Sequence, residues 1–151
     1  MRVTARADYA LRAGVELARA EGSLVKAATL AESARVPLGF LENILADMRR
    51  TGLVRGHRGA EGGYALSRPA AAISVADVIR AVDGPLASVR GEAAQDLDYE
   101  GSAAPLKVLW VAVRASLREL LEQVSLEDLA RDRLPDRVRG LAGAEGAWAS
   151  H

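Results

Sequence analysis

Two short helical segments that lead directly into a glycine-rich hairpin constrain this chain more than any other feature. Helices are expected over residues 28–34 and 38–50, where apolar residues recur every three or four positions and the sequence RVP separates the two. The next stretch, LVRGHRGAEGGYALSRP, predicts short strands at 53–54 and 64–66, and Pro69 ends the second of them. The glycines expected to supply positive φ angles in the loop are Gly56, Gly59, Gly62 and Gly63. A helix-turn-helix followed by a hairpin is a winged helix.

Basic side chains gather around this hairpin, in a chain whose formal net charge is zero. Between positions 49 and 68 the acidic residue is Glu61, and the basic residues are Arg49, Arg50, Arg55, Arg58 and Arg68. Such an excess is either an electrostatic footprint for phosphates or a solvated surface. In a winged helix the second helix of the motif can enter the major groove, while Arg58 at the wing tip would lie in the negative potential of a narrow minor groove. The alternative is a basic turn that faces solvent.

The segments on either side of this motif predict a helical scaffold. A helix over residues 5–20 would be capped by Thr4 and would turn one face inward, formed by Ala7, Leu11, Val15 and Ala18. In ISVADVIRAVDG, Ser74 and Asp77 have the spacing of a capping box, and Ile73 and Val78 that of a hydrophobic staple. A helix is therefore expected over 75–83. Because aromatic residues make up only 4% of the chain, the core is expected to be mostly alanine, leucine and valine.

The second half of the chain predicts an irregular segment, a long helix and a tail. Residues 85–104 lack periodicity and are small, polar and acidic. Pro105 suits the first turn of a helix that runs to about residue 124. Its wide apolar stripe requires a partner, and we expect a second copy of the same helix there, with an interface formed by Leu106, Leu109, Trp110, Val113, Leu117, Leu120, Leu121 and Val124. Ser125 and Asp128 repeat the capping-box spacing and predict a short helix through about residue 131.

Taken in order, the segments TARADYALRAGVELA, ATLAESARVPLGFLENILADMRRTGLV, RGHRGAEGGYALSRP and ISVADVIRAVDGP, with the helix from Pro105, resemble the Rrf2 family of bacterial transcription regulators. The resemblance covers about residues 1–131, and its most specific part is the wing pattern R-G-x-x-G-G-Y-x-L. It implies a mainly α fold with a small β-hairpin wing, a winged helix-turn-helix plus a long C-terminal dimerisation helix. It also implies a homodimer that binds a palindromic operator in double-stranded DNA, with the long helix crossing to the other subunit.

The expected organisation has four parts: a winged helix-turn-helix DNA-binding domain at 1–84, a linker or sensor loop at 85–104, the dimerisation helix and a short helix at 105–132, and a flexible tail at 133–151. The residues expected to contact DNA are Arg6, Leu38, Gly39, Phe40, Glu42, Asn43, Arg49, Arg50, Arg55, His57, Arg58 and Gly59. Glu42 suits the cytosine amino group and Asn43 suits adenine, whereas Gly39 offers no side chain where many family members have serine.

The chain contains no cysteine, which removes the thiolates that hold an iron–sulfur cluster in many Rrf2 proteins. Asp8 stands where some cluster-binding relatives have a ligand, but one carboxylate cannot hold a cluster, and we expect it to interact with the helix dipole. We therefore expect no cofactor, no metal site, and a response to a metabolite or to a partner protein. No apolar run reaches the length of a membrane span and no signal peptide is recognisable, so the sequence predicts a cytoplasmic protein without a membrane partner.

Three other functions compete with an operator-binding regulator of this family. An enzyme is disfavoured because the two histidines, His57 and His151, lie on the wing and at the end of the chain, and no pair of carboxylates or nucleophile–base spacing stands out. A winged helix used only for protein–protein contact is compatible with the fold, although Arg55 and Arg58 argue for DNA. A ligand-responsive repressor of another winged-helix family is the third, and the capping-box helix directly after the wing favours Rrf2.

Overall fold

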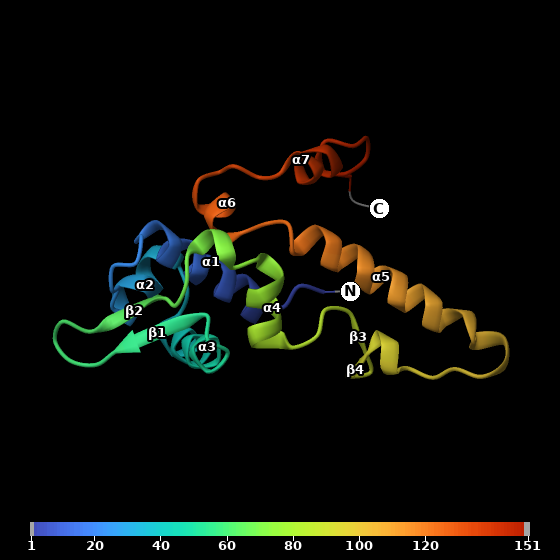
Figure 1. Ribbon diagram of the computed structural model, residues 1–151, viewed down its shortest axis with the longest axis horizontal. Helices are drawn as coiled ribbons and strands as arrows, with labels where there is room; N and C mark the ends of the chain where they lie inside the picture. The colour runs from blue at the N-terminus through green and yellow to red at the C-terminus, as the bar shows by residue number, and fades with distance from the viewer. Residues whose placement is uncertain (1, 150–151) are drawn as a thin grey trace.

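The computed structural model describes residues 2–149 and is mostly helical, with a short β-hairpin that projects from one end (Figure 1). Its elements, in chain order, are α1 (Ala5–Arg19), α2 (Ala27–Ala34), α3 (Leu38–Arg50), β1 (Val54–His57), β2 (Gly63–Leu66), η1 (Ala70–Ala72), α4 (Val75–Asp83), β3 (Ser88–Val89), β4 (Glu92–Ala93), η2 (Ala94–Asp96), η3 (Gly101–Ala103), α5 (Pro105–Leu121), α6 (Leu126–Ala130) and α7 (Asp136–Ala142). The expected fold class, a winged helix-turn-helix followed by a long C-terminal helix, is confirmed.

Helix α1 is the centre of the N-terminal half and contacts α2, α3, α4 and α6. The Thr4 side chain accepts a hydrogen bond from the Ala7 amide at 2.9 Å, which is the cap expected from the sequence. The predicted buried face was placed wrongly, because Leu11, Val15 and Ala18 are only half-buried. The fully covered positions are instead small ones, with the addition of a single leucine: Ala7, Ala10, Ala13, Gly14 and Leu17. A helix surrounded by other helices buries the face that permits the closest approach, and that face is its alanine side.

Helices α2 and α3 form the helix-turn-helix. Arg35 ends α2 in the left-handed conformation (φ 53°), and the Val36 amide donates back to the Ala31 carbonyl at 2.9 Å. Val36 is buried in the turn. The predicted stripe of α3 is confirmed, because its buried residues are Leu41, Ile44, Leu45 and Met48. The opposite face of α3 is therefore left to solvent.

The wing is an antiparallel pair in which Val54 lies opposite Leu66 and His57 lies opposite Gly63. The strands begin and end within three residues of the predicted positions. The expectation of positive φ at four loop glycines is correct for Gly59 and Gly63 and wrong for the other two. Gly62 is required for space instead, because a Cβ there would lie 2.2 Å from the His57 carbonyl oxygen.

Two capping boxes meet where the end of the chain returns to the N-terminal half. The first, Ser74 with Asp77, begins α4 as predicted, with Ile73 and Val78 both buried beside it. The second, Ser125 with Asp128, begins α6. The backbone joins the two, since the Val75 amide donates to the Val124 carbonyl at 2.8 Å and the Leu126 amide donates to the Ile73 carbonyl at 2.9 Å. Helix α6 is thereby held against α1.

Residues 85–104 are more ordered than the linker expected from the sequence. β3 and β4 pair as a small hairpin whose turn, Arg90 and Gly91, has positive φ at both positions. Leu97 is fully buried, as are Leu86 and Ala94 nearby in the chain, and η2 packs on α5. The composition of this segment hid its structure, because three small buried apolar residues produce no periodic signal.

The C-terminal third differs from the prediction in two places. Helix α5 ends at Leu121 rather than near residue 124, and Val124 is buried in its own chain at 5% exposure, so it cannot belong to an interface with another copy. A helix, α7, occupies part of the expected flexible tail, and the Trp148 indole nitrogen donates to the Ala142 carbonyl at 2.7 Å beyond its end. Among residues 2–149 no helix is long and apolar enough to cross a membrane.

Candidate nucleic-acid interface

The exposed face of α3 begins with the residues expected to read base edges. Leu38, Gly39, Phe40, Glu42 and Asn43 are all exposed, and the Phe40 side chain reaches 63%. Its ring lies 6.2 Å from the Tyr9 ring of α1, tilted by 60°, which positions an aromatic side chain that has little else to pack on. The Asn43 amide nitrogen donates to the Gly39 carbonyl at 3.3 Å within the helix. These side chains form one continuous surface on the first turns of α3.

Two of the arginines expected to contact DNA are tied into the fold. Arg6 forms an ion pair with Asp47 of α3, and its Nε donates to the Val82 carbonyl of α4 at 3.2 Å. Arg50 binds the other Asp47 oxygen at 2.7 Å. Asp47 thus shares two guanidinium groups and joins α1 to α3. Arg6 has a structural role here that the sequence did not reveal, because its partners lie 41 and 76 residues away.

The remaining arginines of this face have no carboxylate partner within 4 Å among residues 2–149. They are Arg49 at the end of α3, Arg55 on β1 and Arg58 in the wing loop, and all three are exposed. An Arg55 guanidinium nitrogen lies 3.3 Å from Nε2 of His57, so this histidine points along the same edge of the wing. The exposed surface of α3 and the wing lie side by side at one end of the molecule (Figure 1). The structure brings together ten of the twelve predicted contact residues with both sides of the wing solvent-facing, whereas Arg6 and Arg50 are engaged elsewhere.

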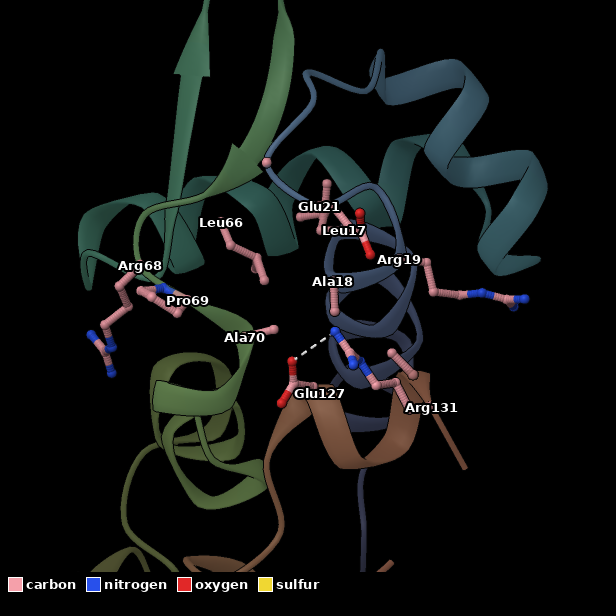
Figure 2. Close-up of a pocket in the computed structure, with 12 residues that line it drawn as sticks. Leu17, Ala18, Arg19, Glu21, Leu66, Arg68, Pro69, Ala70, Glu127 and Arg131 are labelled. Carbon is pink, nitrogen blue, oxygen red and sulfur yellow. Dashed lines mark ion pairs between the residues drawn. The ribbon is translucent and has the colours of Figure 1, made fainter. Parts of the chain in front are cut away.

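A second hollow, of about 620 Å³, lies between the end of α1, the turn after β2 and α6 (Figure 2). Arg131 spans part of it and pairs with Glu127 at 3.1 Å. Glu21 also lines it, so positive and negative side chains are mixed there. This hollow does not continue the basic surface of the wing.

The predicted partner face of α5 is exposed to different degrees. Leu106 and Leu109 are exposed at 38% and 50%, whereas Trp110, Val113, Leu117, Leu120 and Leu121 are half-buried. The sequence reasoning missed Val108 and Val111, which are exposed at 72% and 39%, because they lie off the three-or-four-residue spacing. The Trp110 indole nitrogen is buried and has no hydrogen-bond partner in the described chain.

These features together, a winged helix-turn-helix with a long helix after it, are those of a known protein family. A profile of the Rrf2 family, described as an iron-dependent transcriptional regulator, matches residues 3–132. The chain belongs to the Rrf2 family. A Mycobacterium tuberculosis protein that carries the name of an HTH-type transcriptional regulator is 50% identical over 143 residues, which cover 94% of this chain and 89% of that protein.

Two better-described regulators are also similar. The HTH-type transcriptional regulator CymR of Bacillus subtilis is 33% identical over 86% of this chain and 90% of its own length. The structure of that protein, titled the global cysteine regulator of B. subtilis, superposes with a TM-score of 0.71 at 30% identity, covering 87% of this chain and 98% of the other. The IscR structure from T. potens gives a TM-score of 0.69 at 31% identity, covering 87% of this chain and 88% of the other. This chain is therefore a DNA-binding transcriptional regulator of the helix-turn-helix type.

The side chains present do not fit the iron group that the family description implies. The sequence contains no cysteine, and residues 2–149 bring together no group of three or more histidine, aspartate or glutamate side chains that could hold a metal ion. Asp8 lies in the first turn of α1, where a carboxylate is favoured by the helix dipole, and pairs with Arg12 at 2.7 Å. No step of the function is therefore assigned to iron.

Proposed function

We propose that this chain is a repressor that binds a palindromic operator as a homodimer. The observation that carries the proposal is the exposed surface of α3 beside a wing whose arginines have no acidic partner. In winged helices such a helix lies in the major groove and the wing reaches the adjacent minor groove. A dimer repeats both contacts on the other half of a two-fold symmetric site. We expect it to act in the cytoplasm, where its operator would lie.

The residues at the start of α3 define which bases such a dimer would read. Glu42 can accept a hydrogen bond from the amino group of cytosine, and Asn43 can pair with adenine if its bond to the Gly39 carbonyl is released or shared. Phe40 offers an apolar ring to the methyl group of thymine. Gly39 has no side chain and contributes only by letting the DNA approach closely. The half-site would accordingly contain cytosine, adenine and thymine contacts.

The second subunit would cover the apolar face of α5. Helix α5 extends away from the winged helix (Figure 1), and four large apolar residues on it are exposed: Leu106, Val108, Leu109 and Val111. Contiguous exposed apolar surface of this kind marks a protein–protein interface. A copy of the same helix offers a matching apolar stripe.

We further propose that a metabolite or a partner protein controls DNA binding through residues 85–104. This segment joins α4 to α5 and packs on α5 through η2, so a change in it would move the long helix relative to the winged helix. The check replaces residues 88–93 with a Gly/Ser stretch of equal length, which keeps Ala94 and Leu97 in the core. Loss of the response to the inducing condition in cells, with operator binding retained, is expected.

The decisive experiment is selection of DNA from a random-sequence duplex pool, followed by footprinting of the purified protein. We expect an inverted repeat whose half-site centres lie about one helical turn, 10–10.5 base pairs, or a multiple of it apart. A reporter gene placed behind the selected site should be repressed when the protein is expressed. Failure to enrich any duplex would contradict the proposal and favour a winged helix that binds another protein.

A further inference from the structure

One hollow of the surface has a charge unlike the others. We call it the wing hollow: it measures about 560 Å³ and is lined by Lys26, Ala27, Arg49, Gly56, His57, Arg58, Gly59, Gly62, Gly63 and Tyr64. No carboxylate lines it. Three other hollows of the described surface each include at least one, such as Glu127 in the hollow of Figure 2 and Asp83 in the hollow beside the end of α5.

A backbone bridge brings Lys26 to the wing. The Val25 amide donates to the Tyr64 carbonyl at 2.9 Å, and the Tyr64 amide donates to the Val25 carbonyl at 2.8 Å. Glycine at position 63 makes this approach possible, because a Cβ there would lie 2.7 Å from the Val25 carbonyl oxygen. Lys26, the next residue after the bridge, is exposed at the rim of the wing hollow.

Arg49 approaches the wing hollow from the other side. Its guanidinium lies 3.9 Å from the position that a Cβ on Gly56 would occupy, above the inner strand of the wing. Gly56 is not in the left-handed region, so its role here is one of space. The end of α3, the start of α2 and the wing therefore each direct one basic side chain, Arg49, Lys26 or Arg58, to the same hollow.

We propose that the wing hollow seats a phosphodiester group of the DNA backbone, and that Lys26 and Arg49 bind it. This rests on the proposed function: if α3 lies in the major groove and the wing in the adjacent minor groove, the sugar–phosphate strand that separates the two grooves must pass between them. The wing hollow lies at that place. Lys26 supplies a compact charge and Arg49 a planar pair of donors, a combination suited to a phosphate with two unesterified oxygens. Lys26 thereby joins the DNA-binding surface.

The test measures affinity for the selected operator and for a scrambled duplex over a range of salt concentrations. Lys26→Ala and Arg49→Ala should each lower the slope of log K against log salt by about 0.9 per bound subunit, or about 1.8 per dimer. Because a phosphate carries no sequence information, both duplexes should weaken by a similar factor, on the order of tenfold. The charge-retaining variants Lys26→Arg and Arg49→Lys should recover most of the slope. Arg133→Ala, which removes an exposed cation after α6, is the matched control and should behave as the wild type.

A duplex scan with single neutral methylphosphonate groups locates the phosphate. One position per half-site should weaken the wild-type protein and leave Lys26→Ala and Arg49→Ala unaffected. Replacing chloride by inorganic phosphate at constant ionic strength should weaken the wild type and the variants equally, since the site takes its phosphate from DNA.

Three outcomes would overturn the assignment. They are slopes equal to that of Arg133→Ala, a loss confined to the operator duplex, which would indicate a base contact, or a selective loss in inorganic phosphate, which would indicate a site for a free anion. If the wild-type protein binds neither duplex, the proposed function fails instead. Circular dichroism and thermal melting of each variant should match the wild type, because both side chains are exposed.

Discussion

Helices α3 and α5 have the same kind of apolar stripe in the sequence and opposite fates in the structure. Helix α3 buries Leu41, Ile44, Leu45 and Met48 against its own chain, whereas no residue of α5 is buried in the described chain. α3 packs between α1, α2 and α4, and α5 extends from the body with support from η2 and, to a lesser degree, α4 (Figure 1). Periodicity thus identifies the apolar face of a helix, and leaves undetermined which chain covers it.

The difference assigns different roles to similar residues. A leucine of α3 contributes to the folding of one subunit and keeps the opposite face of the helix free for DNA. A leucine of α5 would contribute to association, and its effect should depend on protein concentration. Substitutions in the two helices should therefore separate folding from assembly.

The largest effect is expected for charges placed on the apolar face of α5. Trp110→Asp combined with Leu117→Asp would bury two carboxylates in the proposed interface, and sedimentation should show monomers or aggregates instead of a dimer. Ala115→Asp, on the opposite face of α5 and exposed, should leave the dimer intact. An unaltered dimer in the double variant would place the interface elsewhere.

In α3, Leu45→Ala should destabilise the fold itself. Leu45 is fully buried, and a cavity at such a site costs about 2–5 kcal/mol of unfolding free energy. Urea denaturation measures this loss, which should persist at all protein concentrations. Leu109→Ala in α5 is the counterpart, and its loss should diminish as the protein is diluted to monomers. If the two variants respond alike to dilution, the contrast between the helices is wrong.

On the wing, Arg58→Ala should weaken operator binding by about 1–3 kcal/mol if the guanidinium enters the minor groove. Melting temperature should not change, because the side chain is exposed and has no partner in the fold. Titration of labelled operator measures the effect, with Arg133→Ala as the reference. Operator affinity equal to that of the reference would remove Arg58 from the interface.

A smaller effect is expected for Phe40. Replacing the contacted thymine by deoxyuridine removes one methyl group and should cost the wild type about 0.8 kcal/mol, the value of one buried carbon. Phe40→Ala should bind the two duplexes equally. Tyr9→Phe preserves the neighbouring ring and serves as the control. Equal binding of both duplexes by the wild type would show that Phe40 does not read thymine.

The smallest effect concerns Glu122, which ties the end of α5 to α4. Hydrogen bonds from Arg80 and then Arg118 hold the pKa of its carboxyl below the ordinary value of 4.5. A lowered folded-state pKa stabilises the protein above the unfolded-state value, and this contribution is lost as the pH falls through the folded-state pKa. Glu122→Gln should therefore lower the melting temperature slightly at pH 7, with the difference shrinking at acid pH. The effect is small because solvent screens the pair. A constant difference across pH would show that the ion pairs are not its cause.

Local signals in the sequence predicted local structure well. Thr4, Ser74 and Ser125 all cap helices as expected, because a cap depends on residues three positions away. The stripe of α3 was correct for the same reason. The start of the wing was recognisable from its glycines, although sterics rather than φ explain Gly62.

Features that depend on distant partners could not be read in this way. The Val25–Tyr64 bridge and the Arg6–Asp47 ion pair join residues about forty positions apart, and nothing in the sequence marks either pair. Lys26 was missed for this reason, and Arg6 was given the role of a DNA contact. The β3–β4 hairpin and α7 were missed because short elements with few buried residues produce no periodic pattern.

The docking of α6 limits how this chain can be divided. Leu126 is fully buried, and its δ carbons lie 3.1 Å from the position of a Cβ on Gly14, so α1 is closed by a residue from beyond the long helix. A fragment cut after Gly84 would lose that side chain and the carbonyl of Val124 that receives the Val75 amide. The reading head is thus not a portable cassette: to graft it onto another protein, or to permute the chain, one must carry α6 along as its missing piece.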